Sequence, residues 1–197
     1  MISGGWPTRQ QNGPFQIISD RRLNMKTTEQ WLNEVKSSPE KLNHWLQRQY
    51  IGEALAAERI ESLAKTTEGK GKILLEKIAS DEAKHRDWVG ELLAARNIEL
   101  PTPTYENDRY WGEVLGNIQT FEEITAAGHH AEAMRLVRIR ALAADTDIDE
   151  DIREVFSKIL PDEEMHSKGF AALSTPEAIQ NTREYHEKGL DMLGLVI

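Results

Sequence analysis

The residues of this chain best suited to chemistry are glutamate and histidine pairs in which the histidine follows three residues later. Two such pairs occur, and a further glutamate lies about thirty residues upstream of each pair, so the half-pattern repeats after about eighty residues. Residues three apart on a helix share one face. Together the pattern comprises six residues: Glu53, Glu82, His85, Glu132, Glu163 and His166.

These six residues lie on helical stripes, which are sets of residues three or four positions apart that share one face of a helix. Apart from the glutamates, the histidines and Tyr50, the residues of these stripes are apolar. The second stripe, for example, reads Leu75, Ile78, Glu82, His85, Val89 and Leu92. Burying an unpaired ionised carboxylate costs several kcal/mol. No Lys or Arg falls on the stripes, so we expect a pair of divalent metal ions to supply the positive charge. The alternative is a polar layer that protonated carboxylates hold together.

Carboxylate and neutral imidazole ligands suit iron or manganese. The chain contains no cysteine. This excludes disulfides, thiolate zinc sites, iron–sulfur clusters and a cysteine nucleophile. Two Fe ions, or two Mn ions in their place, are therefore the expected cofactors.

Composition limits the partners. The 197 residues are 39% hydrophobic and 29% charged, with a formal net charge of −9. That length suits one domain, and the acidic balance argues against a nucleic-acid partner because phosphate binding needs clustered positive charge. No apolar run of about 18 residues occurs, so we expect no membrane span.

The elements that position the six residues read as helices. We expect a short helix over 28–35, four long helices over 39–64, 72–95, 121–144 and 150–173, and a last helix from 176 to about 194. A tight turn at 66–71 joins the first long helix to the second, and another at 145–149 joins the third to the fourth. Residues 97–116 form a long connection between the two helix pairs, with one helical turn near Tyr110. This order predicts an all-α fold, a ferritin-like four-helix bundle with one long crossover and an additional C-terminal helix.

We expect residues 26–197 to form this single bundle domain. Residues 1–25 carry scattered Gly and Pro and no helical period. They predict a flexible N-terminal arm. They also lack the apolar stretch of a secretion signal, which favours a cytoplasmic location.

At these motifs the sequence resembles the ferritin-like di-iron carboxylate superfamily, which includes bacterioferritins and rubrerythrins. Residues 81–85 (Asp-Glu-Ala-Lys-His) and 162–166 (Asp-Glu-Glu-Met-His) carry the resemblance, which covers residues 42–173. It implies that Glu82 and Glu163 bridge or chelate the metals. It also implies one terminal carboxylate and one nitrogen ligand per metal, from Glu53, Glu132, His85 and His166.

The resemblance also assigns roles beside the ligands. It implies that Asp162 orients His85 and that Asp81 orients His166. Ala83 stands where haem-binding bacterioferritins have methionine, so no haem is expected. The missing cysteines leave out the rubredoxin-like domain of typical rubrerythrins, which implies an external electron donor. The branch within the superfamily stays open.

Two more residues lie close to the pattern. Tyr50 precedes Glu53 by one turn, and it could hydrogen-bond a ligand or carry an electron, although core packing is favoured. His129 precedes Glu132 by three residues, and it could be a further ligand, a base or a substrate contact, whereas a polar residue at a channel mouth is favoured. We expect His130 on the surface.

The sequence favours a non-haem di-iron or di-manganese oxidoreductase that activates O2 or H2O2, acts on a small organic substrate, and forms a monomer or homodimer. The main alternative is a ferroxidase that stores iron, or detoxifies peroxide, in a large hollow assembly. A third possibility is a bundle in which the metal only stabilises the fold.

Overall fold

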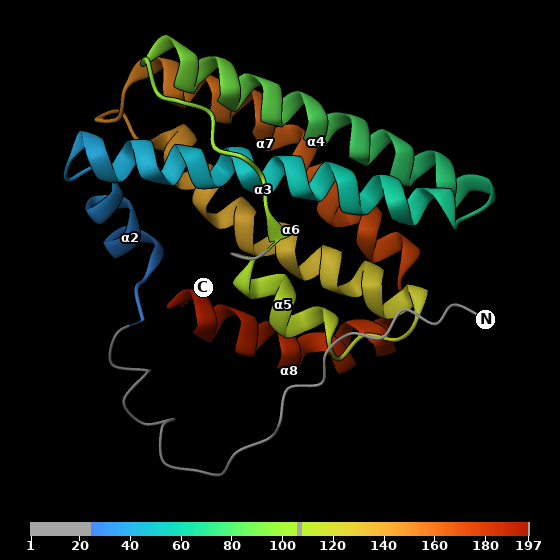
Figure 1. Ribbon diagram of the computed structural model, residues 1–197. Coiled ribbons are helices and arrows are strands. Elements are labelled where there is room, and N and C mark those ends of the chain that lie inside the picture. The colour runs from blue at the N-terminus through green and yellow to red at the C-terminus, as the bar shows by residue number, and fades with distance from the viewer. Residues whose placement is uncertain (1–24, 106–107, 197) are drawn as a thin grey trace.

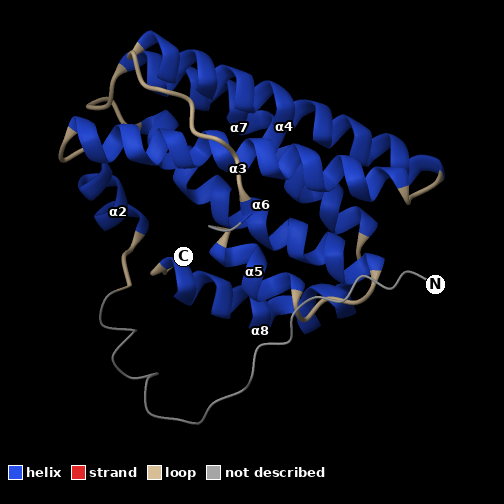
Figure 2. Cartoon of the chain, in the orientation of Figure 1, coloured by secondary structure: helices blue, strands red, loops and turns tan. Residues whose placement is uncertain are grey.

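The computed structural model describes residues 25–105 and 108–196, and these residues are helical apart from loops and turns (Figure 2). The helices are α2 (Thr28–Val35), α3 (Pro39–Lys65), α4 (Gly69–Ala95), α5 (Arg109–Leu115), α6 (Phe121–Ala144), α7 (Glu150–Leu173) and α8 (Pro176–Leu193). The described residues contain no strand, only an isolated bridge between Lys26 and Leu195. The all-α prediction is confirmed. The arm expected over residues 1–25 lies, except for Met25, outside the described residues.

Four long helices form the bundle in two pairs. α3 packs along α4, α6 packs along α7, and α4 also contacts α7 (Figure 1). α5 and α8 pack on each other, and α8 covers α6. Short turns within each pair and one long connection between the pairs match the ferritin-like topology.

The long connection is attached to the outside of α3. Gln47 donates a hydrogen bond to the backbone oxygen of Glu99, 3.1 Å away. Arg59 pairs with Asp108 at 2.6 Å and lies over the ring of Trp111. These contacts guide the chain from the end of α4 across α3 to α5 (Figure 1).

The helix boundaries follow local signals in the sequence. Thr120 and Glu123 form a capping box at the start of α6, and such a box satisfies two backbone N–H groups at once. α4 begins at Gly69, inside the segment expected as a turn. The left-handed backbone of Gly69 (φ +61°) completes the chain reversal there, a conformation that glycine adopts without steric cost.

Two apolar clusters fill the bundle, one towards each end. One contains Trp45, Leu46, Val89, Ile152 and Phe156 among its members. The other comprises Ala56, Ile60, Ala64, Leu75, Ile78, Ala79 and Phe170. On α3, α4 and α7 the residues of the Glu-and-His pattern fall between the segments that supply these clusters, so a polar layer lies between two apolar ones.

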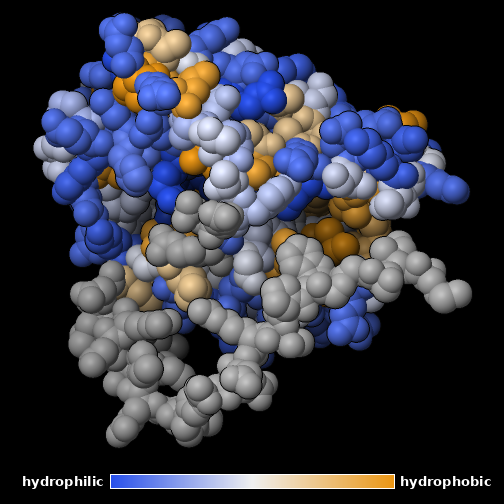
Figure 3. Space-filling model, in the orientation of Figure 1, coloured by the Kyte–Doolittle hydropathy of each residue, from blue (hydrophilic) through white to orange (hydrophobic). Residues whose placement is uncertain are grey.

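The visible face of the molecule is mainly hydrophilic, with small separate apolar areas (Figure 3). Among the described helices, none combines the length and the apolar character that a bilayer crossing requires. The two ends of the described chain meet, because Lys26 N–H donates to Gly194 O at 3.0 Å and Val196 N–H donates to Lys26 O at 3.1 Å.

Candidate metal centre

The four long helices bring together all six residues of the pattern, which we call the Glu/His cluster. α3 supplies Glu53, α4 Glu82 and His85, α6 Glu132, and α7 Glu163 and His166. Five of the six are 0% exposed and Glu132 is 4% exposed. The three- or four-residue steps of the stripes turn each side chain inward, so the polar groups occupy positions that periodicity assigns to the core.

The two histidines share one glutamate, Glu163, and each also faces a second one. His166 Nδ1 lies 2.9 Å from Glu82 Oε1 and 3.5 Å from Glu163 Oε2. His85 Nδ1 lies 3.4 Å from Glu163 Oε1 and 3.9 Å from Glu53 Oε2. The imidazole ring centroids are 5.6 Å apart. Glu163 therefore lies within 3.5 Å of both rings, whereas Glu82 lies close to His166 and Glu53 close to His85.

Half of the side-chain oxygen and nitrogen atoms of the Glu/His cluster are buried and lack a hydrogen-bond partner. The unpartnered buried atoms are Glu53 Oε2, Glu82 Oε1, His85 Nδ1, both oxygens of Glu163, and His166 Nδ1. Buried polar groups in proteins nearly always have partners, and carboxylates with imidazole nitrogens are ligands for divalent iron or manganese. Ligand atoms of Glu53, Glu82, His85 and Glu163 all lie within 4.8 Å of one another. The donor set therefore fits metal ions, and with Glu132 and His166 it suggests a di-metal site.

An aspartate from the facing helix lies behind each histidine. Nε2 of His85 is 3.3 Å from Asp162 Oδ2, and Nε2 of His166 is 3.5 Å from Asp81 Oδ2. With the ring proton on Nε2, each Nδ1 is left free to face the centre. Burial opposes ionisation of Asp81, but Lys77, Lys84 and His166 outweigh it and lower its pKa to about 2. Asp81 therefore keeps its negative charge.

The expectation that no cation pairs with the carboxylates is wrong. Arg135, on α6 one turn after Glu132, forms ion pairs with all four glutamates of the Glu/His cluster. Its side chain is 17% exposed. Arg135 falls just beside the third stripe, next to Leu136, and a long side chain reaches across that offset. The three-residue step from Glu132 was the sequence signal for this contact.

The charges of the Glu/His cluster influence one another strongly. Burial raises the pKa of Glu53 and of Glu132 well above the ordinary value, and repulsion from neighbouring carboxylates adds to the effect. Burial acts the same way on Glu163, but Arg135, His166 and His85 overcome it and hold its pKa well below the ordinary range. Glu163 is therefore the carboxylate most firmly ionised.

Burial disfavours the charged ring of His166, but the adjacent Glu163 and Glu82 outweigh it and raise the pKa of His166 to about 11. Before any metal binds, protonated His166 thus joins Arg135 in balancing the carboxylates. A metal ion would displace that proton from Nδ1, since only the neutral nitrogen can coordinate.

The other candidate residues lie outside the Glu/His cluster. Tyr50 packs against the apolar cluster that contains Trp45 and Phe156. His129 Nδ1 lies 2.9 Å from the backbone oxygen of Ser167, to which it donates a hydrogen bond. His130 is partly buried and its ring stacks on that of His186 at 4.8 Å. The expectation of a surface position for His130 is wrong because α8 covers this part of α6.

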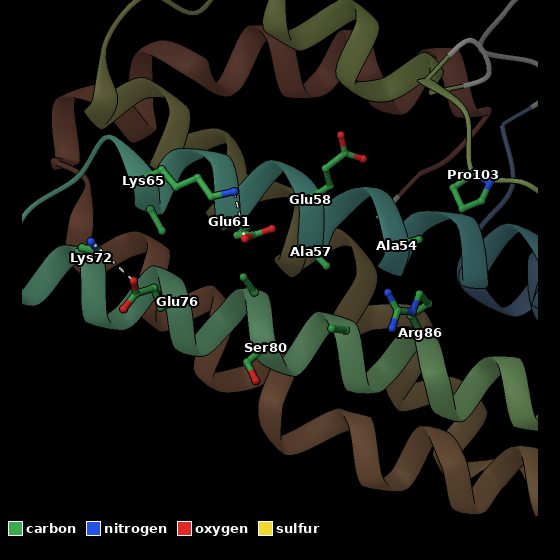
Figure 4. A pocket seen from close by; sticks show the side chains of 13 residues that line it. Ala54, Ala57, Glu58, Glu61, Lys65, Lys72, Glu76, Ser80, Arg86 and Pro103 are labelled. Carbon is green, nitrogen blue, oxygen red and sulfur yellow. Dashed lines mark ion pairs between the residues drawn. The ribbon is translucent and has the colours of Figure 1, made fainter.

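A groove of about 630 Å³ lies on the outer side of α3 and α4, and it is separate from the Glu/His cluster. Alanines such as Ala54 and Ala57 form its floor, and ion pairs such as Glu61–Lys65 and Lys72–Glu76 lie along its sides (Figure 4). No residue of the Glu/His cluster lines it.

Comparison with protein families agrees with this geometry. The family model described as Rubrerythrin matches residues 44–174, a range that contains the whole Glu/His cluster. No curated protein and no solved structure matched the chain. The family model covers more than half of the chain and narrows the resemblance that the sequence left at the level of the ferritin-like superfamily. The chain belongs to the rubrerythrin family.

Proposed function

We propose that this protein is a non-haem di-metal carboxylate oxidoreductase that activates O2 or peroxide. The observation that carries the proposal is the set of unpartnered oxygen and nitrogen atoms that five residues from α3, α4 and α7 direct into one buried layer. A structural polar layer would satisfy these atoms among themselves. Open donor atoms instead favour a site built to receive cations.

Each residue of the Glu/His cluster has a distinct task in this proposal. Glu163, which faces both rings, and Glu82 would bridge or chelate the two metal ions. Glu53 with His85 would complete one metal position, and Glu132 with His166 the other. Bound iron or manganese would supply the electrons that reduce O2 or peroxide. Asp162 and Asp81 would hold the Nε2 protons so that Nδ1 of each ring coordinates.

The surrounding core would keep bulk water away from the site. Ile78 on α4 and Ile159 and Phe156 on α7 are fully buried on the two sides of the polar layer. Apolar surroundings that exclude water strengthen electrostatic interactions and protect reactive species from reaction with water. A small organic substrate and an external electron donor complete the proposal, because the chain has no cysteine for a metal-thiolate donor of its own.

Anaerobic titration with Fe(II), followed by exposure to air and a measurement of assembly mass, tests this function. We expect about two Fe(II) per chain, a transient oxidised chromophore, and a small oligomer such as a homodimer. Iron uptake far beyond two per chain in a large assembly would instead support a ferroxidase that stores iron. Absence of binding would show that the polar layer is structural.

A pair of variants assigns the ligands. Glu163→Ala removes a carboxylate that faces both histidines, so we expect paired metal binding to be lost. Glu58→Ala removes an exposed carboxylate of α3 and should leave metal content unchanged. Equal iron content in the two variants would contradict the ligand assignment.

A further inference from the structure

Arg135 contacts the Glu/His cluster, and the proposed chemistry gives it no role. Its Nη1 donates to Glu82 Oε2 at 3.3 Å and to Glu132 Oε2 at 3.4 Å. Its Nη2 lies 3.0 Å from Glu163 Oε1 and also donates to Glu53. The guanidinium therefore lies among the four carboxylates and balances part of the negative charge that metal ions would neutralise.

Arg135 pairs with only one oxygen of each glutamate: Oε1 of Glu53 and Glu163, and Oε2 of Glu82 and Glu132. Glu53, Glu82, His85 and Glu163 offer ligand atoms that lie within 4.8 Å of one another, and each has at least one unpartnered buried atom. Glu132 is not part of that group, and its Oε2 already accepts a hydrogen bond from Arg135. Among the contacts described, Arg135 does not engage Glu53 Oε2, Glu82 Oε1, Glu163 Oε2 or His85 Nδ1, so these atoms can receive one ion while the guanidinium stays in place.

Charge balance makes the binding of a second ion different from the binding of the first. Two divalent ions would match the four carboxylates, so a guanidinium that remained among them would leave one excess positive charge in a buried layer. Repulsion between charges a few ångströms apart is strong where water is excluded. Because 17% of the Arg135 side chain is exposed, the side chain reaches the surface, and the guanidinium can withdraw in that direction.

We propose that Arg135 is the resident cation of the four carboxylates and makes metal binding stepwise. The first ion binds to Glu53, Glu82, His85 and Glu163 with Arg135 in place. The second ion binds beside Glu132 and His166 only when the guanidinium leaves, so its affinity is lower on the order of 100-fold. This inference rests on the proposed metal-binding role of the Glu/His cluster.

Titration of the full-length metal-free protein with Mn(II), followed by electron paramagnetic resonance, tests the proposal without any activity assay. With one equivalent of Mn(II), the wild-type protein should show the hyperfine pattern of an isolated ion, and calorimetry should resolve a tight step and a weak step. In Arg135→Gln the two steps should converge to within about tenfold. A signal from coupled ion pairs should then appear already at one equivalent.

The matched control is Arg140→Gln, which removes an exposed guanidinium of α6 that pairs with Glu164 rather than with the Glu/His cluster. We expect its two binding steps to equal those of the wild-type protein. Arg135→Lys keeps the positive charge and guards against misfolding of the glutamine variant. We expect the lysine variant to retain two separate steps.

The outcomes separate this inference from the proposed function. Coupled ion pairs in the wild-type protein at one equivalent would overturn the role of Arg135 while leaving the di-metal function intact. Two unequal steps that persist unchanged in Arg135→Gln would overturn it as well. A failure of both the wild-type protein and Arg135→Gln to bind Mn(II) would contradict the proposed function and the inference together.

Discussion

The histidines of the Glu/His cluster each have an aspartate behind them that comes from the opposite helix pair. Asp162 on α7 lies 3.3 Å from His85 on α4. A carboxylate in this position fixes the ring tautomer and makes the ligand nitrogen more basic. We therefore expect Asp162→Ala to weaken metal binding about 10- to 100-fold, as measured by calorimetric titration with Mn(II).

The control for this residue is Asp87→Ala on α4. The Asp87 side chain is 61% exposed and pairs only with its neighbour Arg86 among the contacts described. Its removal should leave the Mn(II) affinity unchanged. An unchanged affinity in Asp162→Ala as well would show that packing alone orients His85.

At this scale, sequence reasoning located the glutamates and histidines because each one breaks an apolar stripe. It missed Arg135, because that residue lies one position off the stripe and enters the polar layer through the reach of its side chain. A stripe records where the Cβ atoms point, whereas a long side chain can end elsewhere. Contacts made by arginine are therefore harder to predict from periodicity than contacts made by short side chains.

At the scale of the helices, close packing of α6 on α7 determines how far Glu132 on α6 lies from Glu163 on α7. Gly128 on α6 faces the ring of Phe170 on α7, and a Cβ at this glycine would lie 2.9 Å from the ring. Phe170 is only 3% exposed and has little room to move. We expect Gly128→Ala to lower the free energy of unfolding by about 1–3 kcal/mol, as measured by urea denaturation.

Gly52→Ala is the control, since Gly52 lies inside α3 and no atom would come within 4 Å of the added Cβ. Alanine restricts the unfolded chain and favours the helix, so this variant should gain about 0.5–1 kcal/mol. A similar loss of stability in both variants would mean that contact with Phe170 is not the cause.

Helix order and boundaries were predictable because local chemistry determines them. Thr120 with Glu123 and Ser38 with Pro39 mark helix starts, and the structure begins α6 and α3 there. The start of α4 was misjudged because Gly69 and Gly71 look alike in sequence, whereas only Gly69 takes a left-handed backbone. Which glycine provides a turn depends on where the neighbouring helix must go.

For the whole molecule, the layer formed by α5 and α8 closes the bundle over α6 by means of polar contacts as well as apolar ones. Tyr110 on α5 donates a hydrogen bond to Nδ1 of His186 on α8, 2.8 Å away, when that nitrogen carries no proton. Helical periodicity does not indicate this contact, because His186 belongs to none of the apolar stripes. Contacts between a terminal helix and a crossover segment depend on the assembled fold.

This contact predicts a dependence of stability on pH. Burial lowers the pKa of His186 from its ordinary 6.5 to about 4, and the adjacent His130 adds to the effect. The charged or titratable groups around it are Tyr110, His129, His130, Arg183 and Glu187. Since the folded protein takes up this proton less readily than the unfolded chain, the stabilisation is complete above pH 6.5 and is lost as the pH falls towards 4.

We expect this loss to amount to about 1–2 kcal/mol, allowing for solvent screening of a partly exposed ring. In His186→Asn the side-chain oxygen can still accept the hydrogen bond from Tyr110 but no longer titrates. Urea denaturation at pH 7, 5.5 and 4 should therefore show a smaller decline in this variant than in the wild-type protein. His44→Asn, at an exposed position of α3, should decline as the wild type does. Parallel declines in all three proteins would assign the acid sensitivity to other groups, with the carboxylates of the Glu/His cluster first among them.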